Sequence, residues 1–205
     1  MSIHPEAPVI WDTTGPRHLA IAGRADVLFS MTRPHVPRVV ADPDDPYREN
    51  LLSCSPDRLS EFAAAERYFL MRHCRGSGIE DLKRSIRLAE LRRHPDLVIV
   101  DLGAAEAEDM MIMSSRAFAN RHGLLAPLGR GECATLAVAS NRRWIAGLDD
   151  RAARTVADDL HVATMTTQDL LRAAAAERIL TPVEAAALNQ ILIDGGFRGD
   201  PQLGI

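Results

Sequence analysis

The 205-residue chain lacks the features that would mark a secreted, membrane-spanning or disulfide-stapled protein. Its three cysteines, Cys54, Cys74 and Cys133, form no even framework and have no metal-ligand spacing, which fits a reduced cytosol. No apolar run approaches the roughly 18 residues that span a bilayer. The N-terminus shows no basic region followed by an apolar run, as a signal peptide would. The sequence therefore predicts a cytoplasmic protein with no membrane partner.

Lysine is also scarce, and a net positive charge is lacking. The formal net charge is -4 and the only lysine is Lys83, so no general basic field indicates nucleic acid. Neither an internal repeat nor a glycine-rich phosphate loop is present. One basic helix face, within residues 79–93, is typical of a solvated surface, with a phosphate-contacting patch as the alternative. Length and composition are ordinary for one globular domain.

Strand-like and helix-like segments alternate along the chain. Short apolar runs predict strands at 7–11, 34–41, 97–100, 144–148 and 161–163. Helical patterns cover 17–31, 56–74, 79–93, 104–120, 133–139, 151–160, 168–176 and 182–194. The polar segments 140–143 and 164–167 are expected to be a loop and a turn. This alternation predicts an α/β fold with a largely parallel sheet and covering helices.

The methionines at 110, 111 and 113 favour core filling over a binding groove.

The stretch 129–154, GRGECATLAVASNRRWIAGLDDRAAR, is the most informative part of the sequence. Glu132 falls in the first turn of a helix, where the helix dipole favours a negative charge. Asp149 and Asp150 follow a buried strand, and Asp12 follows the first strand of the chain in the same way. Ligands bind open α/β sheets at the carboxyl ends of the strands. We therefore expect these acids at one edge of one sheet.

Clustered carboxylates repel each other, which raises a pKa or requires a cation. Mg²⁺ or Mn²⁺ is the usual solution, because hard divalent ions prefer oxygen ligands. We expect Asp12, Glu132 and Asp150 to converge within a single-ion distance. The alternative is structural: Glu132 as a helix-start acid, Asp149 as a helix N-cap and Asp12 as a turn or cap residue.

Four segments resemble one known family. They are VIWDTTGPRHLAIAGRADVL near the start, LGRGECATLAVA, GLDDRAARTVADDLHVATMTTQDLL, and ILTPVEAAALNQILIDGGFRGD near the end. In their order and spacing they resemble the PIN-like subfamily of small prokaryotic nucleases. The resemblance implies a three-layer sandwich around a central, mostly parallel sheet. It implies a single PIN-like domain over residues 1–205, with a helical insertion at about 43–95, where the match is poor.

The resemblance also implies an activity. PIN domains are metal-dependent nucleases, often the toxin of a toxin–antitoxin pair, in which three or four carboxylates hold one or two Mg²⁺ or Mn²⁺ ions. Carried over by position, the catalytic acids are Asp12, Glu132 and Asp150, with Asp149 as a further metal ligand. Substrate contacts fall on Thr13, Arg154 and Thr167. The implied partners are an RNA substrate, a cognate antitoxin protein and a second copy of the chain.

One departure weakens this reading. Pro43 stands where the subfamily usually carries a second acid, and only Asp42 or Asp44 could replace it. A single ion could still bind, because Mg²⁺ often needs only one or two protein carboxylates. One alternative is therefore a catalytically degenerate PIN-like protein that binds a protein partner or nucleic acid without cleaving. Another is an unrelated α/β protein whose acids are caps.

The helices within 56–93 carry three aromatic residues, Phe62, Tyr68 and Phe69. A small core has limited room for three rings on one helix, so we expect apolar surface there for a partner or a second copy.

Overall fold

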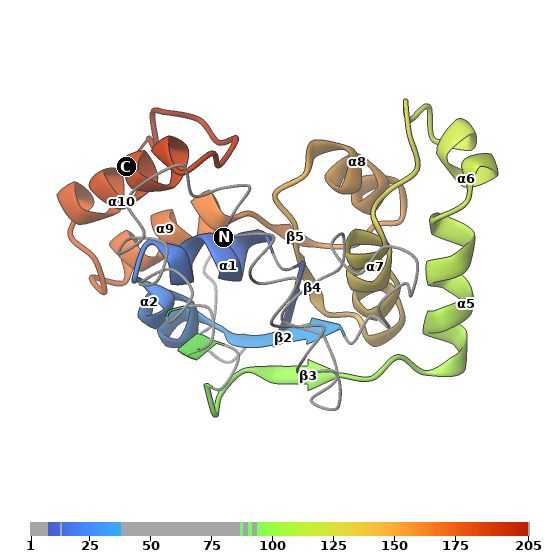
Figure 1. The fold of residues 1–205 in the computed structure, drawn as a ribbon, viewed down its shortest axis with the longest axis horizontal. Coiled ribbons are helices and arrows are strands. Elements are labelled where there is room, and N and C mark those ends of the chain that lie inside the picture. The colour runs from blue at the N-terminus through green and yellow to red at the C-terminus, as the bar shows by residue number, and fades with distance from the viewer. Residues whose placement is uncertain (1–7, 13, 38–86, 88–89, 92–93, 205) are drawn as a thin grey trace.

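The computed structural model describes residues 8–12, 14–37, 87, 90–91 and 94–204. Within these ranges five strands form one sheet in the order β3-β2-β1-β4-β5, and every neighbouring pair is parallel (Figure 1). The strands are β1 (Pro8–Trp11), β2 (Arg33–Pro37), β3 (Val98–Val100), β4 (Ile145–Gly147) and β5 (Thr164–Met165). The predicted α/β class and parallel sheet are confirmed.

The order of the strands creates a switch point between β1 and β4. The chain runs outward from β1 to β2 and β3, then returns to place β4 on the other side of β1. Trp11 pairs with Gly147, so Asp12 and the Asp149–Asp150 pair leave the sheet side by side. The crevice beyond such a switch point is the usual ligand site of an open α/β sheet.

Helices cover both faces of the sheet. Four pack with Val9 and Trp11 of β1: α1 (Thr14–Ile21), α2 (Ala25–Met31), α9 (Thr167–Ala176) and α10 (Pro182–Asp194). The others belong to the side of Ile10: α5 (Ala104–Met113), α6 (Arg116–Arg121), α7 (Arg130–Arg142) and α8 (Arg151–Asp159). Successive strand residues point to opposite faces, so β1 contributes to two separate apolar cores. Figure 1 shows the two groups on either side of the strands, which confirms the three-layer sandwich.

Each of two predicted long helices is divided into two shorter helices in the structure. The segment 17–31 is broken at Gly23, whose φ of 75° lies in the left-handed region and ends the helix after α1. The segment 104–120 is broken after Met113, and the Ser115 hydroxyl accepts a hydrogen bond from Phe118 N (3.1 Å) at the start of α6. A serine that bonds the backbone in this way starts a helix more readily than it continues one.

The predicted loop at 140–143 is wrong, because α7 continues to Arg142. The Arg142 guanidinium forms two hydrogen bonds with the carboxylate of Glu106, from Nε (2.6 Å) and Nη2 (2.8 Å). Glu106 is buried, and a bidentate charged pair of this kind fixes the last turn of the helix.

The position predicted for the fifth strand is also wrong. The sequence predicts a strand at 161–163, but β5 is Thr164–Met165, within the segment predicted to be a turn. His161 has a φ of 57° just after α8, so the chain is still turning there. Pairing of Thr164 with Ala146 of β4 then defines the strand. The predicted strand at 34–41 is confirmed only over β2, since residues 38–41 lie outside the described ones.

The expectation for the methionines holds for Met113, which is buried in the core, and for Met110, which is partly buried and packs against the same core. Met111 is 70% exposed and Ile112 49% exposed. Both line a hollow of about 350 Å³ together with Phe118 and Arg121.

The described part of the chain includes no helix that is long and apolar enough to cross a membrane. The insertion predicted at 43–95, with Phe62, Tyr68 and Phe69, lies almost entirely outside the described residues.

Candidate active site

Asp12 is fixed by the backbone of its neighbours. Its N–H donates to the carbonyl of Gly147 (2.9 Å), which extends the pairing of β1 with β4 by one residue. Its Oδ2 accepts hydrogen bonds from the Thr14 hydroxyl (2.8 Å) and the Thr14 N–H (3.4 Å) at the start of α1. Asp12 therefore serves the turn, as the structural alternative expected. Its Oδ1 has no hydrogen-bond partner among the described residues.

Glu132 lies in the first turn of α7, as predicted. Its Oε2 accepts a hydrogen bond from the Gly129 N–H (2.7 Å), and α7 packs on β1 and β4, which directs this end of the helix to the strand ends. The pKa of Glu132 is raised to about 7, mainly by burial and then by the negative charges of Asp12 and Asp150. The hydrogen bond from the Gly129 N–H lowers this pKa and so opposes the shift. The carboxylates thus act on one another across three elements.

Asp149 is held differently from the other acids. Thr167, at the start of α9, donates from its N–H to Oδ1 (2.7 Å) and from its hydroxyl to Oδ2 (2.7 Å). The pKa of Asp149 is raised to about 6, mainly by burial and to a lesser extent by the negative charge of Asp12. The two Thr167 hydrogen bonds and the positive charge of Arg154 lower this pKa and so oppose the shift. Both oxygens of Asp149 are therefore used to join the end of β4 to α9.

Asp150 is the N-cap of α8. Its Oδ1 accepts a hydrogen bond from the Ala153 N–H (3.0 Å), while the residue is exposed. The alternative reading placed this cap at Asp149, which is wrong by one residue. Capping occupies one oxygen only, and Oδ2 has no described partner. A cap and a ligand role are thus compatible in this residue.

The structure brings Asp12, Glu132 and Asp150 into electrostatic contact, but it does not form a finished cage. Among the described residues, no three His, Cys, Asp or Glu side chains are grouped closely enough to hold a metal ion. The expected convergence of Asp12, Glu132 and Asp150 to a single-ion distance is therefore not met in the structure. Their role as metal ligands stays a prediction.

The three predicted substrate residues have different outcomes. Thr13 lies outside the described residues, as do Asp42 and Asp44. The Thr167 hydroxyl is engaged by Asp149. Arg154 acts on Asp149 through its charge, and its buried Nε has no hydrogen-bond partner among the described residues.

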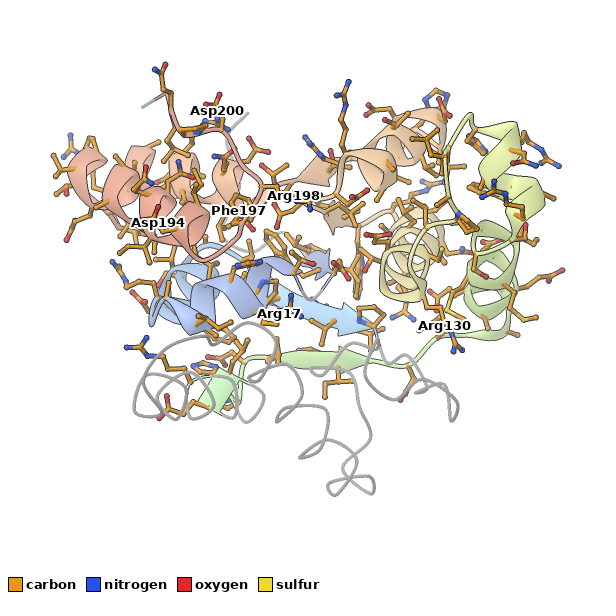
Figure 2. All side chains as sticks on the ribbon, turned by 45° about the horizontal axis from the view of Figure 1, so that its top comes forward. Arg17, Arg130, Asp194, Phe197, Arg198 and Asp200 are labelled. Atoms are coloured by element: carbon orange, nitrogen blue, oxygen red, sulfur yellow. The ribbon has the colours of Figure 1, made fainter. Side chains whose placement is uncertain are left out.

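Sequence reasoning missed three residues at this edge. Thr14 orients Asp12, and its position two residues after the acid is typical of an Asx-type turn. Arg17, labelled in Figure 2, lies on α1; burial lowers its pKa, and the charge of Asp12 opposes that shift. At Gly15 an added Cβ would lie 2.7 Å from the Thr167 hydroxyl oxygen, so only glycine fits between α1 and α9.

One comparison with known proteins identifies the family. Residues 97–204, just over half of the 205-residue chain, match the family model DUF3368, described as a PIN domain. The chain belongs to the PIN-domain family. The matched part of this PIN domain contains Glu132, Asp149 and Asp150, and β1 adds Asp12 from outside the matched range. Searches of curated proteins and of solved structures found no match.

The donor chemistry of this PIN domain fits a hard divalent ion. Asp12, Glu132 and Asp150 each keep one carboxylate oxygen that no described residue bonds. A cation would relieve the burial and repulsion that raise the pKa of Glu132. The neighbouring thiol is unsuited to a soft metal, because burial raises the pKa of Cys133 to about 12. Oxygen-only ligands are typical of Mg²⁺ and Mn²⁺ sites.

Proposed function

We propose that the protein is a metal-dependent ribonuclease, a phosphodiesterase of the PIN type that uses Mg²⁺ or Mn²⁺. The observation that carries the proposal is the mutual effect of three carboxylates from three elements at the switch point. Asp12 follows β1, Glu132 begins α7 and Asp150 begins α8, yet the charges of the two aspartates help to raise the pKa of Glu132 to about 7. Clusters of this kind are more frequent at functional sites than elsewhere.

In this proposal Asp12, Glu132 and Asp150 hold the ion. When bound, it supplies a water of lowered pKa and stabilises charge on the phosphate under attack. The chain's own contribution is orientation. Thr14 fixes the carboxylate of Asp12, Gly129 N–H that of Glu132 and Ala153 N–H that of Asp150. Each acid therefore keeps one oxygen without a described partner, while its other oxygen is bonded to the backbone or to a neighbouring side chain.

Asp149, Thr167 and Arg154 form the supporting group. We assign Asp149 and Thr167 to positioning, because their paired hydrogen bonds hold β4 against α9. Asp149 is also proposed as a further metal ligand. Arg154 partly neutralises Asp149, and its buried Nε–H has no partner in the described part of the chain, which suits a substrate phosphate. Thr13 is kept as a substrate contact on the family resemblance alone.

We further propose that this is a cytoplasmic toxin of a toxin–antitoxin pair, with a single domain, a helical insertion at about 43–95, and an antitoxin or a second copy as partner. Membership of the PIN family and the resemblance to its small prokaryotic members support this. Induced expression is expected to arrest growth, and Asp12→Asn is expected to relieve the arrest. Continued arrest by that variant would separate toxicity from the proposed site.

The second candidate is a PIN domain that binds without cleaving. Two observations favour it: Pro43 at the position of the second acid, and the lack, among the described residues, of a ready-made group of metal ligands. In that case the protein would bind RNA or a partner with the same affinity whether or not Mg²⁺ or Mn²⁺ is present.

Cleavage of a broad set of RNA and DNA substrates, with Mn²⁺ titrated by calorimetry, tests the proposal. We expect cleavage and Mn²⁺ binding by the unaltered protein, and neither by Asp12→Asn or Glu132→Gln. Asp158→Asn is the matched control, since Asp158 is an exposed acid on α8 outside the cluster. Loss in Asp42→Ala or Asp44→Ala would identify a fourth ligand. No Mn²⁺ binding and no cleavage by the unaltered protein would favour the binding-only alternative.

A further inference from the structure

The segment after α10 is held in a defined path. Gln168 donates from Nε2 to the Asp200 carbonyl (2.6 Å), and its Oε1 accepts from the Asp200 N–H (3.1 Å). Asn189 donates to the same carbonyl (2.9 Å) and accepts from Gln168 Nε2 (2.9 Å). Both amide side chains are buried, so these bonds form away from competing water. The backbone at Asp200 is thereby fixed against α9 and α10.

A second contact fixes the segment a few residues earlier. Phe197 is buried, and its ring meets that of His18 edge to face, with 5.6 Å between the ring centres. Gly196 has a φ of 97°, which lets the chain turn sharply from the end of α10 towards α1. Residues 198 and 199 therefore lie between two fixed points, the contact of Phe197 with His18 on α1 and the hydrogen bonds of Asp200 with Gln168 on α9.

Those two helices both begin at the candidate active site. Thr14, at the start of α1, bonds Asp12, and Thr167, at the start of α9, bonds Asp149. Gln168, which anchors the segment, is the next residue after Thr167. In Figure 2 Arg198 lies near the middle of the molecule, between the C-terminal helices and the half that contains α7 and α8. The segment thus lies against the two helices whose first residues bond Asp12 and Asp149.

Arg198 is the cation that this segment carries. It is exposed, and it forms no ion pair or hydrogen bond with any described residue. It is also not among the charges that shift the pKa of Asp149 or Glu132, whereas the charge of Arg154 lowers the pKa of Asp149. Its charge is therefore not used to neutralise these two acids. A guanidinium offers five N–H donors in a planar fork that suits phosphate oxygens.

We propose that Arg198 binds a backbone phosphate of the nucleic-acid strand beside the one that is cleaved, and so positions the substrate. This inference rests on the proposed function. The carboxylates act on the reacting phosphate, and Arg198 contributes to strand binding from outside their cluster. The buried amides and the ring of Phe197 restrict the backbone that carries Arg198, which reduces the entropy lost when the side chain binds.

The test compares Arg198→Gln with Arg178→Gln in the full chain. Arg178 is also exposed and has no described ion pair, but it follows the opposite end of α9. Binding of a fluorescent single-stranded RNA is measured in EDTA over a range of salt concentrations, and cleavage is measured with Mn²⁺. We expect Arg198→Gln to weaken RNA binding roughly tenfold, as one charged hydrogen bond would. The salt slope should fall by about 0.7.

In cleavage we expect KM to rise by a similar factor while kcat changes little, with no change in either constant for Arg178→Gln. Arg198→Lys should retain the salt slope but lose part of the affinity, because it keeps the charge without the fork. Equal melting temperatures for the three variants and the unaltered protein would confirm that folding is not the cause.

The outcomes separate this inference from the proposed function. Cleavage by the unaltered protein together with identical binding by both glutamine variants would overturn the role of Arg198 alone. Weaker binding by Arg198→Gln without cleavage by any form would uphold phosphate binding by Arg198 and overturn the nuclease. An unaltered protein that neither binds nor cleaves RNA would overturn both.

Discussion

Thr167 donates two hydrogen bonds of 2.7 Å to Asp149, one to each carboxylate oxygen. The residues are 18 positions apart, and the pair joins the end of β4 to the start of α9. Asp149 is thereby set apart from its neighbour Asp150, which the sequence alone presents as an equivalent acid.

Thr167→Val tests this anchor. Thr167 is fully buried, and valine keeps its shape but leaves one oxygen of Asp149 without a donor. We expect the free energy of unfolding to fall by about 1–3 kcal/mol. Urea denaturation at pH 8 measures this, with Thr155→Val as the control, because Thr155 is exposed and bonds only its own helix. Equal losses in the two variants would contradict a special role for the Asp149 bond.

Gly15→Ala tests the close approach of α1 to α9. Alanine is favoured over glycine in a helix by about 1 kcal/mol, but here the new Cβ would lie 2.7 Å from the Thr167 hydroxyl oxygen. We expect Thr167 to be displaced, so that cleavage by the altered protein falls at least tenfold. Gly103→Ala is the control, since a Cβ there meets its nearest described neighbour at 3.6 Å. Unchanged activity in Gly15→Ala would show that the contact is not needed.

The pKa of Glu132 predicts how the metal-free protein responds to pH. Burial raises this pKa from 4.5 to about 7, so between those values the folded state binds more protons than the unfolded state. Stability in EDTA should therefore fall as pH rises from about 4.5 to about 7, and then level off. Each unit of pKa corresponds to about 1.4 kcal/mol, so the loss amounts to a few kcal/mol at most.

Glu132→Gln should remove this component and be more stable than the unaltered protein at pH 8, but not at pH 4.5. The pKa of Asp149, raised to about 6, adds a smaller loss in the same direction, which remains in the variant. Denaturation midpoints at several pH values measure both. Mn²⁺ should reduce the loss, because a bound cation stabilises the ionised acid. A rise in stability between pH 5 and 8 without metal would contradict the arrangement.

Two substitutions at Asp150 separate capping from chemistry. Asparagine is as good an N-cap as aspartate, so Asp150→Asn should preserve stability within about 0.5 kcal/mol. It should nevertheless abolish cleavage, because the charged ligand is lost. Asp150→Ala removes the cap as well and should cost about 1 kcal/mol more. Full activity in Asp150→Asn, with loss only in Asp150→Ala, would show that Asp150 acts as a cap alone.

Much of the fold can be predicted from the sequence, because helices and strands are indicated by residues that are close together in the chain. Alternating apolar strands and helical periodicity predict the α/β class, and α10 was predicted to the residue. Thr181 and Pro182 mark its start, and the Thr181 hydroxyl accepts from the Glu184 N–H (3.2 Å) as a capping residue should. The first-turn position of Glu132 was predictable for the same reason. The errors at Gly23 and Ser115 also concern single residues, where a turn conformation or a side-chain bond outweighs periodicity.

The site depends on relationships that have no local signal. Asp12 is placed beside Gly147 by the pairing of β1 with β4, across a long stretch of chain. The same sequence of strands in another order would separate Asp12 from Glu132. The choice of Thr167 as the partner of Asp149, and the raised pKa of Glu132, likewise follow from tertiary packing. The sequence by itself determined which residues are acids at strand and helix ends. Only the tertiary structure decided which of them face one another, because charge and hydrogen bonding act through space rather than along the chain.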